Sequence, residues 1–313
     1  MNRIAVVSLA VAVSTAAHAQ SLHVADSLLE RGRLDRAESL YYAAVRARPR
    51  DPVAREALGR YLAARGAQRV AVTLFEEALQ FGGPPAIVSA DLAPLYLELG
   101  DYHALGSLPS SPLSAGEKAR VAWLQAHPTR VVAPDSTITA SFRGLTEGYI
   151  GRIPIRVNSH IVEALVDVSS RGITISDSMA TAAKVHTFAD KQSPNAVGAV
   201  AGAADSIGIG RLSIMNSPLT IAPIKVPALI GLDMLGRFAA TFDASAQRVT
   251  LRVSGTLIPP SSSATVLSTL AKPSDWLVLQ ANGWTSLREP AIAKLLHDHR
   301  WSLDAKRGQI VIE

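Results

Sequence analysis

The sequence predicts a chain of two structural regions, with α-helices first and β-strands after them. Three observations support this order. Gly32, Gly66 and Gly100 are evenly spaced along the chain, at an interval typical of stacked helical hairpins. Residues 128–136 then form a polar stretch that is bracketed by prolines, as in a linker. Beyond it, short alternating apolar runs replace the helical pattern and indicate β-strands.

Residues 1–19 are expected to be a signal peptide. Arg3 supplies a positive charge, the run from Ile4 to Ala17 is apolar or small, and Ala17-His18-Ala19 matches the A-x-A cleavage pattern. The run is shorter than the roughly 20 residues of a membrane-spanning helix, although an N-terminal anchor is the alternative. We therefore expect cleavage after Ala19, a mature chain that starts at Gln20, and a periplasmic or secreted location.

Composition narrows the function classes. The chain has 313 residues, enough for two domains, and it has no cysteine. This excludes disulfides, thiol catalysis, zinc–thiolate sites and iron–sulfur clusters. The net charge of +5 comes from scattered cations rather than clusters, so nucleic-acid binding is not expected. No later apolar run could span a membrane, and neither a metal nor a cofactor is expected.

The same interval relates other residue types in the first region. The recurring pairs are Ala37 with Ala71, Tyr41 with Phe75, Ala44 with Ala78 and, one residue out of step, Pro49 with Pro84. Small alanines let two helices approach closely, and the aromatic residue fills the space between neighbouring units. Each glycine permits the tight turn between helices because it adopts positive φ at little cost.

These positions make residues 20–128 resemble the tetratricopeptide repeats. The family pattern is followed at Leu58-Gly59, Gly66, Ala71, Phe75, Ala78 and Pro84. The third unit departs from it, because Leu105 stands where a small residue is expected. A generic bundle of helical hairpins is the alternative. The resemblance implies a groove that holds peptides or partner proteins, but no residue identifies the ligand.

A capping helix over Ala115–Ala126 and a linker over residues 129–140 are predicted next. A β domain should follow over residues 141–253. Its predicted strands are 153–157, 161–166, 173–176, 205–209, 212–214, 219–221, 241–243 and 248–253, with one helix at 180–184.

The order of these elements resembles the retropepsin-like aspartic proteases, above all their bacterial exported relatives. The residues that carry the resemblance are Val157-Asn158-Ser159, Leu165-Val166-Asp167, a flap at Val197-Gly198-Ala199-Val200-Ala201-Gly202, the segment Leu229 to Leu235, and Phe242-Asp243 with Leu251. It implies an acid-protease β barrel that hydrolyses peptide bonds with water. Asp167 would be the catalytic carboxylate, one of two that share a proton. Since one chain supplies one such loop, activity would require a homodimer.

The catalytic loop departs from the family pattern. Asp167-Val168-Ser169-Ser170 stands in place of Asp-Thr-Gly-Ala. Val168 lacks the hydroxyl that ties paired loops together, and Ser169 adds a Cβ where the family has glycine. Asp167 is therefore a working catalytic residue, the remnant of a degenerate site, or an ordinary aspartate at a strand end. Asp233 and Asp243 are interpreted as structural residues that cap a helix and a turn.

The tail, residues 254–313, should begin with a linker at 259–264 and continue as a β/α extension. Asn282-Gly283 is a strong hairpin signal, a helix is predicted at Pro290–His299, and two strands should follow. This order resembles the end of the β domain, so a worn-down second half of the same fold is one interpretation. The domain would then be a pseudo-two-fold monomer, without a second Asp-Thr-Gly loop.

Two hypotheses for function remain. In the first, an exported aspartic peptidase with partner-binding repeats cleaves a polypeptide through Asp167. In the second, a catalytically degenerate relative binds a peptide or protein as a scaffold. They differ in whether a second carboxylate meets Asp167.

Overall fold

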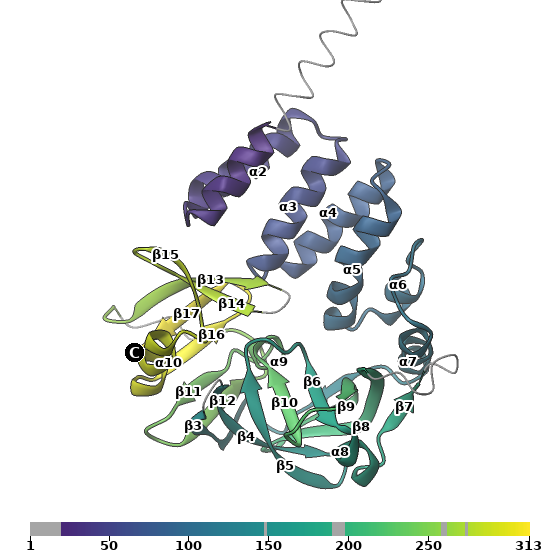
Figure 1. Ribbon diagram of the computed structural model, residues 1–313, viewed down its shortest axis with the longest axis vertical. Helices are drawn as coiled ribbons and strands as arrows, with labels where there is room; N and C mark the ends of the chain where they lie inside the picture. The colour runs from purple at the N-terminus through teal and green to yellow at the C-terminus, as the bar shows by residue number, and fades with distance from the viewer. Residues whose placement is uncertain (1–19, 147–148, 190–197, 258–261, 273–274) are drawn as a thin grey trace, which may run out of the picture.

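The computed structural model describes residues 20–146, 149–189, 198–257, 262–272 and 275–313. The expected signal peptide over residues 1–19, Val197 of the expected flap and part of the expected linker at 259–264 lie outside these ranges. The described chain forms a helical region followed by a β region, which confirms the predicted fold class (Figure 1).

The helical region is a row of antiparallel helices. Residues 20–30 are helical, and the helices after them are α2 (Leu34–Ala47), α3 (Pro52–Ala64), α4 (Gln68–Gln80), α5 (Pro85–Leu99), α6 (Tyr102–Gly106) and α7 (Ala115–Ala126). The evenly spaced glycines occupy the turns, with φ of 71° at Gly32, 85° at Gly66 and 74° at Gly100. Ala71 and Phe75 are buried in one core between the helices, as the repeat pattern predicts.

The β region begins inside the expected linker. Of residues 129–140, three form strand β1 (Arg130–Val132), which pairs with β9 (Leu212–Ala222), and the last four belong to β2 (Thr137–Ser141), which pairs with β12 (Arg248–Arg252). The prediction of a linker is therefore wrong. Distant strands hold this segment through backbone hydrogen bonds, and the three exposed residues of β1 carry no apolar alternation that would reveal a strand.

Six strands close into a barrel. They are β4 (Tyr149–Val157), β5 (His160–Asp167), β6 (Ile173–Ser176), β8 (Val200–Ile209), β9 and β10 (Ala228–Gly231). The order β9-β6-β10-β5-β4-β8 returns to β9, so the ring has no free edge among these strands. Ile153, Ile175 and Ile207 are fully buried in its core. The short β3 (Arg143–Thr146), β7 (His186–Phe188) and α8 (Asp177–Ala182) flank it.

A second sheet contains both the end of the barrel domain and the tail. Its strands run in the order β15-β14-β13-β17-β16-β11-β12-β2. The members not yet introduced are β11 (Thr241–Asp243), β13 (Thr265–Lys272), β14 (Asp275–Gln280), β15 (Gly283–Ser286), β16 (Trp301–Asp304) and β17 (Gln309–Ile312).

The centre of this sheet has two-fold character. β11 and β16 pair antiparallel at the middle, and each is followed in the chain by its outer neighbour, β12 or β17. Each is also preceded by a helix, α9 (Leu232–Gly236) or α10 (Pro290–Asp298). The Phe242 and Trp301 rings stack across the middle with centroids 4.2 Å apart. The tail thus repeats the helix–strand–strand order found at the end of the barrel domain.

The helical region is joined to the β region at several points. Arg65 Nη1 donates to the carbonyl oxygens of Thr269 at 2.6 Å and Gly308 at 3.0 Å. The indole N–H of Trp284 donates to the carbonyl of Leu29 at 2.6 Å. These contacts place the turns of the helical repeats on the tail (Figure 1). Across the described helices, none is both long enough and apolar enough to cross a lipid bilayer.

Candidate functional site

Asp167 lies at the point where the barrel strand β5 ends. Strand β10 runs parallel to β5, and its last residue, Gly231, is in register with Asp167. A Cβ on Gly231 would collide with the carbonyl oxygen of Ser170, so only glycine lets this strand pass close to the loop. The Asp167 side chain is largely buried, with 8 % of its surface exposed. The loop is therefore held in place by the barrel.

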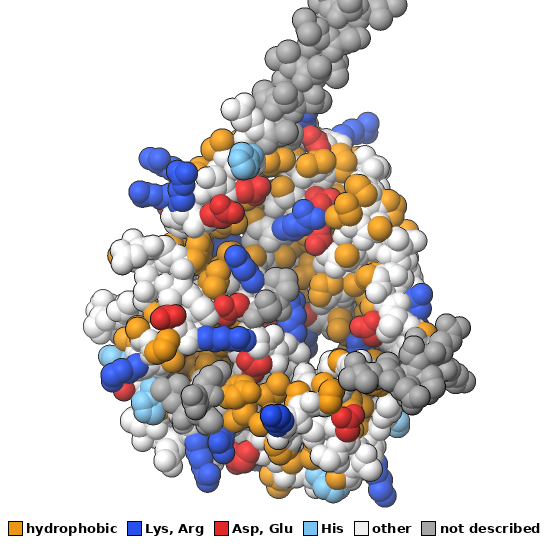
Figure 2. All heavy atoms as spheres, viewed as in Figure 1, with side chains coloured by type: hydrophobic (Ala, Val, Ile, Leu, Met, Phe, Trp, Pro, Cys, Tyr) orange, Lys and Arg blue, Asp and Glu red, His pale blue; other side chains and the backbone are white. Residues whose placement is uncertain are grey.

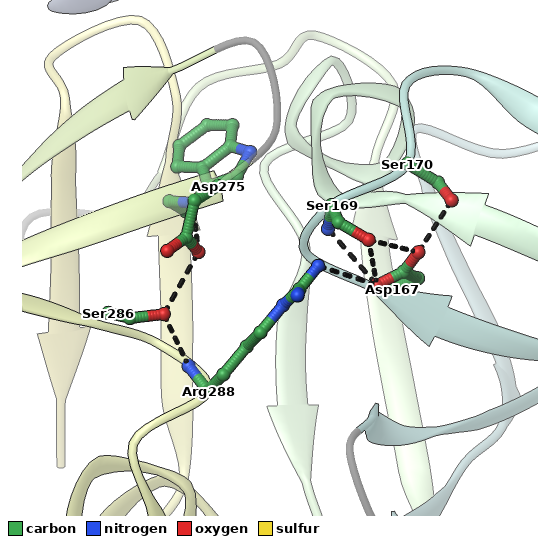
Figure 3. Close-up of polar contacts among 7 residues, drawn as sticks. Asp167, Ser169, Ser170, Asp275, Ser286 and Arg288 are labelled. Atoms are coloured by element: carbon green, nitrogen blue, oxygen red, sulfur yellow. Dashed lines mark hydrogen bonds and ion pairs between the residues drawn. The ribbon is translucent and has the colours of Figure 1, made fainter.

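Two serines of the loop turn toward the Asp167 carboxylate (Figure 3). Ser169 donates from its backbone N–H to Oδ1 at 3.0 Å and from its hydroxyl to both oxygens, at 2.9 and 2.7 Å. The Ser170 hydroxyl donates to Oδ2 at 2.6 Å. Ser169 and Ser170 thus form a hydrogen-bond shell around the carboxylate. Val168 is buried in the barrel core.

Arg288 reaches the same carboxylate from the tail. Its Nη2 lies 3.8 Å from Asp167 Oδ1, and 44 % of its side chain remains exposed. The backbone N–H of Arg288 donates to Ser286, whose hydroxyl donates to Asp275. Figure 3 shows the guanidinium between the Asp167 loop and the hairpin that carries Asp275. Among the described residues, Asp167 thus contacts a cation from the tail.

Arg288 was not identified from the sequence. It stands between a hairpin and a helix, and no local motif marks it. Its position is the available signal for a contact with Asp167. Residues 287–289 immediately precede α10, and Gly231, which is in register with Asp167, immediately precedes α9.

The other carboxylates considered from the sequence have structural partners. Asp233, in the first turn of α9, accepts the backbone N–H of Gly172 at 3.0 Å with both oxygens and so ties α9 to the Asp167 loop. Asp243 accepts the backbone N–H of Ala246 and the hydroxyl of Ser245. These hydrogen bonds, that of Ala246 first, lower the pKa of Asp243. Asp275 begins β14 and accepts the backbone N–H of Trp276.

The expected flap falls in two kinds of structure. Gly198 and Ala199 are exposed and lie outside regular structure, whereas Val200, Ala201 and Gly202 begin the long strand β8. Gly202 pairs with Leu219 on one side and Thr187 on the other, inside the barrel sheet. The C-terminal half of the expected flap is thus part of the wall of the barrel.

A cavity of about 720 Å³ lies between the helical region and the Asp167 loop. Val168, Ser170 and Arg171 line it from the loop, and Trp276 lines it from the tail. Helices α3 and α5 form the opposite wall. Figure 2 shows hydrophobic and charged side chains together on the face between these parts. Across the described ranges, no group of three or more His, Asp or Glu side chains is arranged to hold a metal ion.

Comparisons with known proteins find similarity in structure only. No family model matches the sequence, and no curated protein matches it. A retropepsin-like aspartic protease from Rickettsia conorii matches with 18 % identity over 39 % of this chain and 90 % of its own, at a TM-score of 0.28. The retroviral protease-like domain of Ddi1 from Leishmania major matches with 15 % identity over 34 % and 90 %, at 0.27. Basic 7S globulin from soybean matches with 12 % identity over 38 % and 42 %, at 0.23.

Proposed function

We propose that this chain is a peptide-binding module of retropepsin-like architecture that does not hydrolyse peptide bonds. The observation that carries the proposal is the guanidinium of Arg288 against the carboxylate of Asp167. Aspartic peptidases work with two carboxyl groups that share one proton. An arginine cannot replace the second group, because its guanidinium stays protonated and cannot exchange the proton.

The second sheet argues against a homodimer that would restore catalysis by supplying a second Asp167. A two-fold partner would have to bring its own Asp167 against this one. The chain's own tail already covers the edge of β11 with β16, and it already places Arg288 at the carboxylate. The proposed module is therefore a pseudo-two-fold monomer, and a partner protein would bind elsewhere.

The helical region supports the binding half of the proposal. Its repeats resemble a family that holds peptides in a groove. In this chain, helices of the repeat region line a cavity that is bordered on its other side by the Asp167 loop. A cavity of this size, with mainly apolar walls that also carry charged side chains, can hold a ligand. We retain export as part of the proposal, on the sequence pattern of residues 1–19.

A peptidase assay tests the catalytic half. The wild type, Asp167→Asn and Arg288→Asp are incubated with a mixed peptide library at acidic and neutral pH, and products are counted by mass spectrometry. We expect cleavage near background for the wild type and no change for Asp167→Asn. Robust wild-type cleavage that Asp167→Asn abolishes would instead establish a working aspartic peptidase and overturn the proposal.

The Arg288→Asp variant tests the reason for inactivity. It places a second carboxyl group opposite Asp167, so a gain of cleavage at acidic pH should appear in Arg288→Asp. The double variant Arg288→Asp with Asp167→Asn should lose that gain. Equilibrium dialysis of the wild type against the same library tests binding, and retention of a subset of peptides is expected. If no peptide is retained, the binding half of the proposal is wrong.

A further inference from the structure

The β14–β15 hairpin contacts the helical region at the turn before α2 (Figure 1). Leu279 on β14 packs so closely against Gly32 that a Cβ on this glycine would collide with it. Trp284 on β15 donates its indole N–H to the carbonyl oxygen of Leu29 at 2.6 Å. Leu279 and Trp284 are partners in the strand ladder, and the turn that contains Asn282 joins them. The length of the main chain in this turn therefore sets the spacing of the two contacts.

Asn282 and Gly283 together have the chemistry to change that length. Asparagine is among the thermolabile residues of proteins. The main-chain nitrogen of Gly283 can attack the side-chain carbonyl carbon of Asn282. A carbon–nitrogen bond forms, the bond to the side-chain nitrogen breaks, and ammonia leaves a five-membered imide. Water then opens the imide to an aspartyl residue, or to an isoaspartyl residue whose main chain is one carbon atom longer.

The structure leaves this asparagine open to the reaction. Asn282 is exposed, and its side-chain amide forms no hydrogen bond with another described residue. Gly283 has a φ of 112°, and nothing lies within 4 Å of a Cβ built on it, so this glycine is uncrowded. It pairs with Gln280 at the end of the ladder beside the turn, where strand pairs fray first.

The two other asparagines of the described chain are held by hydrogen bonds, and each is followed by serine instead of glycine. Asn158 donates from Nδ2 to the carbonyl oxygen of Ala183 at 2.8 Å, and its Oδ1 accepts the N–H of Ser206 at 3.1 Å. Asn216 donates from Nδ2 to the carbonyl oxygen of Pro128 at 3.3 Å. These bonds fix the two amides, so the chain contains its own controls.

We infer that Asn282 deamidates spontaneously in the folded protein, and that the isoaspartyl product loosens the β14–β15 hairpin from the turn before α2. The added main-chain carbon lies between Leu279 and Trp284, so the two anchors lose the spacing that their contacts require. The aspartyl product adds a negative charge but leaves the main-chain length unchanged. This modification site does not depend on the peptide-binding function proposed above.

Peptide mapping by mass spectrometry tests the site. The folded full chain is incubated at mildly alkaline pH in heavy-oxygen water, whose label separates this reaction from deamidation during digestion. We expect deamidation at Asn282 to be at least tenfold faster than at Asn158 or Asn216. In urea, the rates at Asn158 and Asn216 should rise because their hydrogen bonds are lost, whereas the rate at Asn282 should change less than threefold. Similar rates at all three sites of the folded chain, or a large rise at Asn282 on unfolding, would overturn the site.

Hydrogen exchange tests the structural consequence. Aged wild type is compared with Asn282→Gln aged in the same way, because glutamine forms its larger imide far more slowly, and with fresh Asn282→Asp, which carries the charge alone. We expect aged wild type to exchange faster at residues 29–32 and 279–284, in proportion to its isoaspartyl content, and both variants to stay at the level of fresh wild type. Equal exchange in aged wild type and aged Asn282→Gln would overturn the loosening. The same gain in Asn282→Asp would overturn the role of the added carbon.

Discussion

At the scale of single residues, the Asp167 loop could be predicted in part. The sequence indicated the carboxylate and the two serines that follow it, because they stand at a strand end in a recognisable order. It could not indicate Arg288, which reaches Asp167 only after the tail has folded against the barrel domain. Contacts between distant segments leave no local pattern in the sequence.

Glu98 provides a prediction about pH at the same scale. Burial raises the pKa of Glu98, and the nearby Asp233 raises it further, whereas Arg237, Gln68 and Arg171 oppose the shift. Because the pKa is higher in the folded state than in the unfolded state, ionisation of Glu98 opposes folding. This loss begins as the pH rises above the unfolded pKa, and it is complete once the pH has passed the folded pKa.

We therefore expect Glu98→Gln to stabilise the protein at pH 7, with a gain that shrinks toward pH 4. Glutamine keeps an oxygen that can accept the hydrogen bond from Gln68. Urea unfolding at both pH values measures the effect, with exposed Glu163→Gln as the control that should show no such trend. The quantity to compare is the free energy of unfolding of Glu98→Gln minus that of wild type. If this difference were smaller at pH 7 than at pH 4, the assigned direction of the pKa shift would be contradicted.

At the scale of elements, the sequence predicted most helices and strands because their apolar periodicity is local. The capping helix was predicted at Ala115–Ala126 and is observed there. The linker at 129–140 was predicted wrongly because β1 and β2 depend on pairing with β9 and β12. Short strands of this kind are stabilised by partners far away in the chain, and their own residues need not alternate.

The repeat glycines allow a controlled test of how the two regions dock. Gly66 and Gly82 both have positive φ, 85° and 88°. A Cβ on Gly66 would overlap the carbonyl oxygen of Ala305, whereas nothing lies within 4 Å of a Cβ on Gly82. Alanine at either position carries the cost of left-handed backbone, about 1–2 kcal/mol. Only Gly66→Ala must also displace the tail.

We expect Gly82→Ala to lower the free energy of unfolding by about the backbone cost alone, and Gly66→Ala to lower it clearly further. Urea unfolding monitored by circular dichroism measures both. Gly66→Ala should also increase proteolysis of the tail under native conditions, while Gly82→Ala should not. Equal losses in the two variants would show that the close approach to Ala305 contributes nothing to docking.

At the scale of the whole molecule, two large hydrophobic cores lie within the described residues. One consists of helical residues between Leu22 and Leu124, and the other spans the barrel and the tail. The contacts between the regions include hydrogen bonds to backbone carbonyls and the packing of Trp123 against Phe188. The sequence predicted this division through the change of periodicity near residue 130, but the cavity between the regions depends on their docking and could not be predicted.

The separate cores predict that residues 20–128 fold alone. Their apolar contacts lie within the segment, so a helical circular-dichroism spectrum and cooperative melting are expected. The melting temperature should be lower than that of the same helices in the full chain, because the contacts of Arg65 and Trp284 are lost. A disordered spectrum would show that the helices need the β region to fold.

The central pairing of β11 with β16 also has a consequence for the order of folding. Strand β11 cannot complete its hydrogen bonds until residues 301–304 have emerged from the ribosome, so its edge stays open while the tail is being made. Such edges promote aggregation, and contacts of long sequence separation form slowly. The helical repeats, whose contacts are local, should fold well before this sheet closes. Between synthesis of β11 and pairing with β16, the chain should therefore contain folded helical repeats and an incomplete second sheet. Aggregation is favoured most in this interval.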